Sequence, residues 1–100
     1  MLFPVDNNFK AYHQAAEILK ALAHPVRLCI IRGLMEKKQC NVSYMQECLD
    51  LPQSTVSQHL QKLRSAGIVE AERNGLEIHY RIVDEKIQQL ITVLFKEEQV

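Results

Sequence analysis

The sequence predicts a mainly α-helical domain with a small β-hairpin, about five helices plus two strands in all. Five stretches place apolar residues at steps of three and four, which is the spacing of an amphipathic helix. Another stretch alternates apolar and polar residues after Asn74-Gly75, a pair that favours a tight hairpin turn. A short helical stretch and a longer one meet at Leu51-Pro52, which indicates a sharp turn between two helices. Helices, a paired helix and turn, and a hairpin in this order predict a winged helix-turn-helix.

Length and composition fit one small domain. One hundred residues predict a single domain over residues 1–100, with a core large enough to fold alone. No apolar run reaches membrane-spanning length, and no basic region followed by an apolar segment marks a signal peptide. The three cysteines form no CxxC pair, as expected for reduced thiols. We therefore expect a cytoplasmic protein with no membrane partner.

The sequence contains no glycine-rich phosphate loop, no HExxH motif and no nucleophile elbow. We expect no enzymatic activity and no cofactor. Twelve Lys and Arg balance twelve Asp and Glu, so the net charge is zero. This neutrality counts mildly against a DNA-binding protein, which is often basic, and the distribution of charge becomes more informative than its sum.

The N-terminal third predicts two helices. After an arm that contains Pro4, a helix is expected over about residues 8–23. Its apolar stripe is wide enough to face both a core and a partner chain. The partner-facing residues are expected to be Phe9, Tyr12, Ala16 and Leu19. Pro25 suits the first position of a second helix, over about residues 25–35, because its missing N–H has no helical partner there. The buried residues of this helix should be Leu28, Ile31 and Leu34, with Arg27 pointing elsewhere.

The third helix is expected to be short, over about residues 44–49. A very short extended piece, residues 40–42, precedes it. Ser43 is the expected N-cap, with Gln46 three residues later completing a capping box. Asp50-Leu51-Pro52 is the turn into the fourth helix.

The fourth helix carries the most informative surface. Val56, Leu60 and Leu63 share one narrow apolar stripe, and the opposite face has no acidic side chain. Short polar groups followed by cations suit base edges and then phosphates, and Gly67 is expected to end the helix. The predicted DNA-binding residues are Gln53, Ser54, Thr55, Ser57, Gln58, Gln61, Lys62 and Arg64, together with Arg73 and Asn74 of the hairpin.

The C-terminal third predicts a hairpin and a helix. A strand is expected over residues 68–72, a type I′ turn at Arg73-Asn74-Gly75, and a return strand over residues 77–82. Asp84 should cap a last helix over about residues 84–97. Its partner-facing residues are expected to be Ile87, Leu90, Ile91 and Leu94. Together with the first helix, this helix should form a dimer interface.

Two stretches resemble the ArsR/SmtB family of bacterial repressors. ALAHPVRLCIIRGL is similar to the family's second-helix signature, and LPQSTVSQHLQKLRSAGIVEAERNGLEIHYRI is similar to its helix-turn-helix and wing. The residues that fall on the pattern are Ser54, Ser57, His59, Leu60, Leu63, Gly67, Val69, Tyr80 and Ile82. The resemblance runs from about Ala21 to Ile82. It implies a homodimeric repressor that reads an inverted-repeat operator in double-stranded DNA and is released by an inducer.

The metal-binding patterns of the family are not matched. Members with a third-helix site carry two cysteines where this chain has Asn41 and Ser43. The four ligand positions of the family's last-helix site correspond here to Asp84, Lys86, Glu97 and Val100, and only Asp84 matches the family pattern. We therefore predict no metal at these sites, while a metal-responsive repressor with an atypical site stays an alternative.

The cysteines leave two interpretations open. Cys29 and Cys40 are the candidate thiol sensor, for a persulfide, an oxidant or a thiophilic metalloid, and Cys48 is expected in the core. Lys37 and Lys38 precede Cys40 and are expected to lower its pKa and raise its reactivity. The other interpretation is that all three thiols are inert.

A different class of function is also open. The zero net charge and the acidic strand before the hairpin turn would suit a winged-helix module that docks on a protein without specific DNA binding. Salt dependence separates the two, because a DNA-binding protein loses affinity steeply as salt rises.

Overall fold

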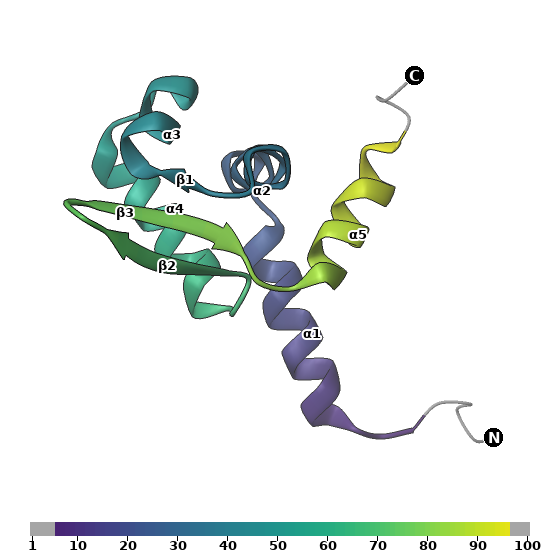
Figure 1. Cartoon of the computed structure of the whole chain (residues 1–100). Helices are drawn as coiled ribbons and strands as arrows, with labels where there is room; N and C mark the ends of the chain where they lie inside the picture. Colours follow the sequence, from purple (N-terminus) through teal and green to yellow (C-terminus); the bar gives the residue numbers. More distant parts are fainter. Residues whose placement is uncertain (1–5, 97–100) are drawn as a thin grey trace.

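The computed structural model describes residues 6–96, which form five helices and three strands (Figure 1). In chain order these are α1 (Phe9–Leu22), α2 (Pro25–Lys37), β1 (Cys40–Asn41), α3 (Val42–Leu49), α4 (Gln53–Ser65), β2 (Val69–Asn74), β3 (Glu77–Ile82) and α5 (Glu85–Leu94). α3 and α4 form the helix-turn-helix, and β2 and β3 form the wing. The predicted winged helix-turn-helix is confirmed, with β1 as an additional short strand. None of the helices among the described residues is long and apolar enough to cross a membrane.

One apolar core joins α2, α4, the sheet and α5. The most completely buried large side chains are Ile31, Val56, Leu60, Leu63, Ile68 and Ile91. Val56, Leu60 and Leu63 are the stripe predicted for the fourth helix, and each is 0% exposed. Full burial of such a side chain contributes about 1.5–3 kcal/mol. α4 is therefore held to the body by its apolar side, and its polar side is left outside.

The start of α3 differs from the prediction. Asn41 caps the helix in place of Ser43, because the Asn41 side chain accepts a hydrogen bond from the Tyr44 N–H at 2.8 Å. Helix α3 therefore begins at Val42. The backbone of Asn41 is extended (φ −92°, ψ 165°), as an N-cap requires, because this residue also pairs in β1.

The turn between α3 and α4 depends on Asp50 and Pro52. Asp50 adopts the left-handed conformation (φ 55°, ψ 48°) directly after α3. Pro52 is the residue before α4, and its carbonyl accepts hydrogen bonds from the N–H groups of Thr55 and Val56. The break that the sequence indicated at Leu51-Pro52 is confirmed.

Gly67 ends α4 as predicted. It has φ 77°, which a side chain would disfavour. The Gly67 N–H donates to the Arg64 carbonyl and the Ile68 N–H donates to the Leu63 carbonyl, both at 3.0 Å. These two bonds form a Schellman motif, and the buried pair of Ile68 and Leu63 is its usual apolar contact.

The sheet has the antiparallel order β1-β3-β2, and the wing turn lies one residue later than predicted. Asn74 pairs with Glu77, which leaves Gly75 and Leu76 as the two loop residues. Gly75 has φ 69°, whereas the φ of Leu76 is not positive. A positive φ at the first loop position alone is typical of a type II′ turn. The predicted type I′ turn is therefore wrong, because the glycine occupies the position where φ must be positive.

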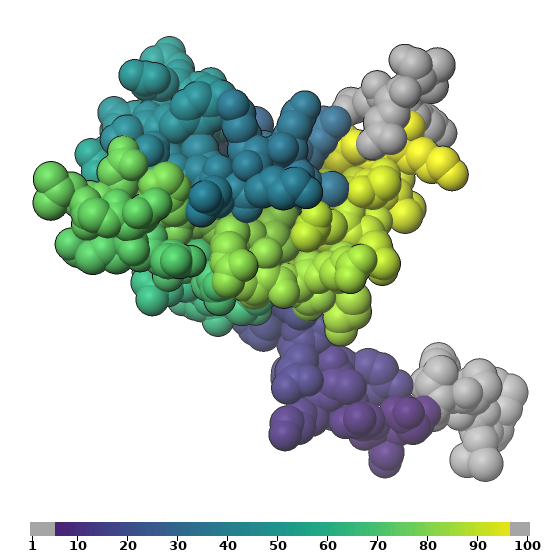
Figure 2. All heavy atoms as spheres, in the orientation of Figure 1, coloured from purple at the N-terminus to yellow at the C-terminus, as the bar shows by residue number. Residues whose placement is uncertain are grey.

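α1 projects from the rest of the molecule (Figures 1 and 2). Its only buried residues are Ala21 and Leu22, at the end that joins α2. Phe9 is 65% exposed and Leu19 is 56% exposed. A helix of this length is marginal in water unless its apolar side is covered. The exposed apolar stripe of α1 therefore needs another surface to cover it.

Two residues predicted to face a partner chain belong to the core of this chain instead. Ile87 is 3% exposed and Ile91 is 1% exposed, so a second chain could bury almost nothing more of them. Leu90 is half-buried against the same core, and Leu94 is 61% exposed. The apolar stripe of α5 is wide enough to turn one edge into the core and to leave the other edge, at Leu94, outside.

Candidate DNA interface

The predicted DNA-binding residues of the fourth helix lie together on the outward side of α4. The exposed ones are Gln53, Ser54, Ser57, Gln58, Gln61, Lys62 and Arg64, and Thr55 is half-buried. α4 contains no acidic residue from end to end. Hydroxyl and amide groups come first and cations occupy the last turn, so this surface offers donors and acceptors to base edges and positive charge to phosphates.

The start of α4 suits a phosphate. Among the described residues no side chain caps this helix, so its first N–H groups stay available. Uncapped N–H groups and the positive end of the helix dipole favour a bound anion. Within the reading surface, Gln61 is partly engaged, because its side-chain amide donates to the Ser65 hydroxyl at 3.4 Å.

The wing supplies Arg73 and Asn74 at the end of β2, where both side chains are exposed. Glu70, Glu72 and Asn74 lie on the opposite side of the strand from Arg73, because alternate residues of a strand face opposite ways, so the structure does not bring Arg73 and Asn74 to one side of the wing. Glu70 is also paired with Arg81 across the ladder. The wing therefore presents a cation at its tip, while its acidic residues face away from that cation.

A buried arginine connects α2 to α4. The sequence analysis did not predict this contact. Arg27 is 9% exposed, its Nε donates to the Ala21 carbonyl at 2.6 Å, and its Nη1 lies 3.3 Å from Nδ1 of His59. The ring of His59 packs on that of His24, with centroids 4.4 Å apart. The expectation that Arg27 points away from the core is wrong, because its side chain satisfies the end of α1 and reaches α4. The sequence feature that could have indicated this contact is His59, a polar residue directly before the buried Leu60.

The stability of the protein should depend on pH through His59. Burial lowers the pKa of His59 below its ordinary value of 6.5, and the charges of His24, Arg27 and Lys62 lower it further. The unfolded chain therefore binds more protons than the folded chain between that lowered pKa and 6.5. We expect the part of the free energy of unfolding that depends on neutral His59 to be fully present above pH 6.5. This part should be lost as the pH falls through the pKa of His59 in the folded chain.

Denaturant unfolding at several pH values checks this expectation. His59→Gln should flatten the dependence on pH below 6.5. An equal slope in the wild type and in His59→Gln would contradict the role of His59.

All three cysteines of the chain line one cavity of about 220 Å³ between α2, β1 and α3. Cys29 is exposed on α2, Cys40 is half-buried in β1, and Cys48 is exposed on α3. The expectation that Cys48 lies in the core is wrong, because Met45 is the buried residue of α3. The structure therefore brings together Cys29 and Cys40, the predicted sensor pair, and adds Cys48.

Cys40 is not activated by the basic residues before it. Burial raises the pKa of its thiol, the neighbouring Cys48 raises it further, and Lys37 lowers it by less. Lys37 does act in the predicted direction, but the predicted net lowering of the Cys40 pKa is wrong because burial outweighs it. Lys37 instead places its ammonium 4.8 Å from the centre of the Tyr44 ring.

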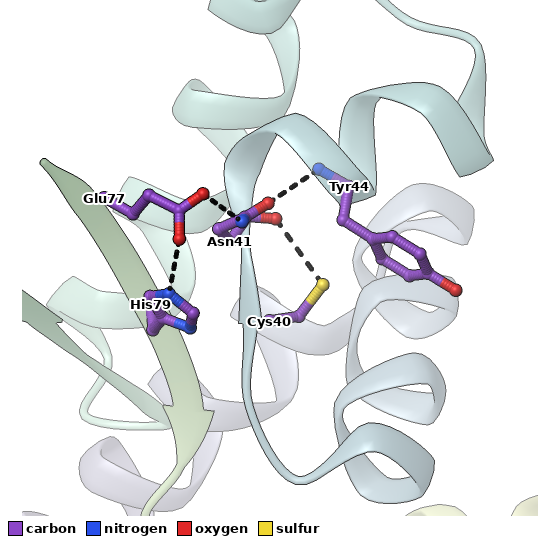
Figure 3. Close-up of polar contacts among 5 residues, drawn as sticks. All are labelled: Cys40, Asn41, Tyr44, Glu77 and His79. Carbon is purple, nitrogen blue, oxygen red and sulfur yellow. Dashed lines mark hydrogen bonds and ion pairs between the residues drawn. The ribbon is translucent and has the colours of Figure 1, made fainter. Parts of the chain in front are cut away.

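β1, which contains Cys40 and Asn41, is hydrogen-bonded to the wing through the Asn41 side chain (Figure 3). The Asn41 side chain donates to Glu77 at 3.0 Å, and Glu77 lies 3.2 Å from Nε2 of His79, so the start of α3 is tied to β3. The Cys40 sulfur lies on the side of Tyr44 and donates to the Asn41 carbonyl at 3.5 Å. A shift of β1 or α3 would therefore also move the wing.

The positions of the family's metal residues have other structural roles here. Asn41 and Asp84 are both helix caps, the latter through a hydrogen bond from the Lys86 N–H at 2.9 Å. Glu97 and Val100 lie outside the described residues. Within residues 6–96, no group of three His, Cys, Asp or Glu side chains is arranged to hold a metal ion.

A family model described as a helix-turn-helix domain matches residues 22–72. The transcriptional repressor PagR of Bacillus anthracis is 47% identical over 79 residues, which cover 79% of each chain. Its crystal structure superposes with a TM-score of 0.80, at 42% identity, and covers 87% of this chain and 99% of that one. The repressor SmtB of Mycobacterium tuberculosis is 39% identical over 89% of this chain, which spans 65% of SmtB. This chain belongs to the ArsR/SmtB family of winged helix-turn-helix transcriptional repressors.

A solution structure from Mycobacterium bovis adds the assembly of one relative. Mb0332, a possible ArsR-family regulator, is described as a homodimeric winged helix-turn-helix DNA-binding domain. It is 30% identical, covers 99% of this chain and 91% of its own, and superposes with a TM-score of 0.81. The relatives named in these comparisons are transcriptional repressors and a possible transcriptional regulator.

Proposed function

We propose that this ArsR/SmtB repressor acts as a homodimer that reads an inverted-repeat operator. The observation that carries the proposal is the acid-free polar side of α4, exposed above three fully buried apolar residues of the same helix. Two copies of α4 related by a twofold axis would enter successive major grooves about 34–36 Å apart. The exposed stripe of α1 and the outer edge of α5 at Leu94 are the surfaces that a second copy would cover.

Base reading is assigned to Gln58, in the middle of the exposed side of α4. Gln58→Ala should lose about 1–3 kcal/mol of binding to the operator and relax the preference at one base pair. Lys62→Ala should weaken the binding of all sequences alike, because a phosphate contact carries no sequence information. Binding titrations with operator and random DNA distinguish the two, and equal losses on both DNAs in Gln58→Ala would contradict base reading.

The competing function is docking on a protein, which the zero net charge favours. The arrangement of charge argues against it, since the cations lie on the last turn of α4 and at the wing while Glu70 is paired with Arg81. Operator affinity should fall steeply and linearly with the logarithm of salt concentration. A flat salt dependence would favour the protein-docking alternative.

We further propose that thiols control release from DNA. The support is that all three cysteines line one cavity, beside the helix that precedes the reading helix. A change at these thiols would displace α3 or β1 and, through the Asp50–Pro52 turn, the orientation of α4.

A protein with all three cysteines replaced by serine tests this proposal. It should bind the operator like the wild type but should no longer release it when polysulfide or arsenite is added. Single variants then show whether Cys29 and Cys40 act as a pair. Release that persists without any cysteine would remove thiols from the mechanism.

A further inference from the structure

We propose that the cavity lined by Cys29, Cys40 and Cys48 binds a small apolar α,β-unsaturated carbonyl compound, and that Cys48 captures this compound covalently. The effect on DNA rests on the thiol-controlled release proposed above. The capture itself depends only on the cavity and can be measured without DNA.

The walls of the cavity suit a hydrocarbon body. Ile30 and Leu34 come from α2, and Met45 and Leu49 come from α3. The volume of about 220 Å³ is below the range of about 300–1,000 Å³ that is usual for drug-sized ligands. A single ring or a short chain would therefore fill it.

Cys48 is the best placed nucleophile of the three. It is exposed on α3 and lies four residues after Tyr44, so the two side chains share one side of the helix. Cys40 is half-buried and hydrogen-bonded to the Asn41 carbonyl. Cys29 lies on the opposite wall, on α2.

Lys37 supplies a positive charge at the same place. It lines the cavity, as Cys40 and Cys48 do, and its ammonium lies 4.8 Å from the Tyr44 ring centre. A lysine with an ordinary pKa is in the ammonium form at neutral pH. A cation stabilises an oxygen on which negative charge develops.

These groups match the needs of conjugate addition. The Cys48 thiolate forms a bond from sulfur to the β-carbon, and the carbon–carbon π bond breaks. Its electron pair moves to the carbonyl oxygen as an enolate, next to Lys37. The α-carbon then takes a proton from water, which replaces the proton lost from the thiol. The product is a thioether, and no oxidant or reductant is consumed.

The same geometry is less suited to a metal or metalloid bridge. A three-ligand site needs three soft groups within bonding reach of one ion, and among the described residues no group of three His, Cys, Asp or Glu side chains is so arranged. A largely apolar cavity with two exposed thiols, Cys29 and Cys48, and with Lys37 and Glu36 among its lining residues favours an organic electrophile instead.

An adduct on Cys48 would act on the reading helix through α3. Met45 of α3 is buried in the core and Asn41 at its start is bonded to Glu77 of the wing, so α3 cannot move alone. We expect the adduct to weaken operator binding by about 5–150-fold, the usual range of coupling between two sites.

The test is the time course of labelling with 2-cyclohexen-1-one, with acrylamide as a polar acceptor of the same reactivity class, followed by peptide mass spectrometry. Cys48 should be labelled first by cyclohexenone, and its preference over Cys29 should be larger than with acrylamide. Lys37→Gln should slow the labelling of Cys48 several-fold. The matched control Lys38→Gln should not, because Lys38 is exposed and does not line the cavity.

A mobility shift with the labelled protein completes the experiment. The labelled wild type should release the operator, and cyclohexenone-treated Cys48→Ser should keep it. Equal labelling of Cys29 and Cys48, or labelling that is indifferent to Lys37→Gln, would overturn the site. Selective labelling without release would overturn its regulatory role. Failure of the untreated protein to bind an operator would instead count against the proposed function and would leave the labelling result standing.

Discussion

A Leu19→Glu protein should be monomeric and should bind operator DNA about a hundredfold more weakly or worse. Leu19 is 56% exposed on the projecting helix α1, in the stripe that also contains Phe9 and Tyr12. A carboxylate buried there in a dimer would have to lose its hydration without a partner charge. Two reading helices joined in one dimer bind with an avidity that either helix alone cannot reach, so loss of the dimer removes most of the affinity.

Sedimentation and operator titration of the same preparation check this expectation. Gln14→Glu introduces the same charge at an exposed polar position of α1 and should stay dimeric. A dimeric Leu19→Glu protein with full affinity would show that α1 is not part of the interface. Leu94→Glu is the corresponding variant on α5, whereas Ile87 and Ile91 are unsuitable because their substitution would disrupt the core.

Leu60→Ala should cost about 2–5 kcal/mol of the free energy of unfolding. Leu60 is 0% exposed between two other buried residues of the α4 stripe. Its truncation removes favourable burial and leaves a cavity that close-packed neighbours fill only in part. Because small domains have about 5–15 kcal/mol of stability in total, a large fraction of the molecules should be unfolded at elevated temperature.

Leu76→Ala is the matched control, because Leu76 is 100% exposed at the tip of the wing. Its free energy of unfolding should change by less than about 0.5 kcal/mol. Denaturant unfolding of the two variants gives both values. A loss in Leu60→Ala no larger than that in Leu76→Ala would show that α4 is not anchored through its apolar stripe.

Periodicity and turn chemistry were sufficient to predict most of the elements. The i, i+4, i+7 spacing of Val56, Leu60 and Leu63 predicted both the fourth helix and its buried side, because only one side of a helix can face a core. Gly67 could be assigned as a helix end since its conformation is accessible to glycine at little cost. The polar surface of α4 followed as the complement of the buried stripe. The wing turn was displaced by one residue because strand pairing, rather than the Asn-Gly pair, sets the register.

Local sequence pattern could not decide whether the residues of a wide apolar stripe face the core or a partner chain. Ile87 and Ile91 fit a core and a dimer interface equally well at helical spacing, and the packing of α5 assigned them to the core. Periodicity identifies the residues that share one side of a helix. It contains no information about which neighbouring element covers that side.

The sequence by itself determined the winged helix-turn-helix and the acid-free polar side of α4, because both follow from patterns among residues close in the chain. Only the tertiary structure showed that Arg27 reaches His59, that Cys48 is exposed, and that three cysteines from α2, β1 and α3 line one cavity. The physical reason why the sequence could not show these three features is the same. Burial, charge and thiol reactivity depend on groups that are distant in sequence, and the packing of the helices brings those groups together.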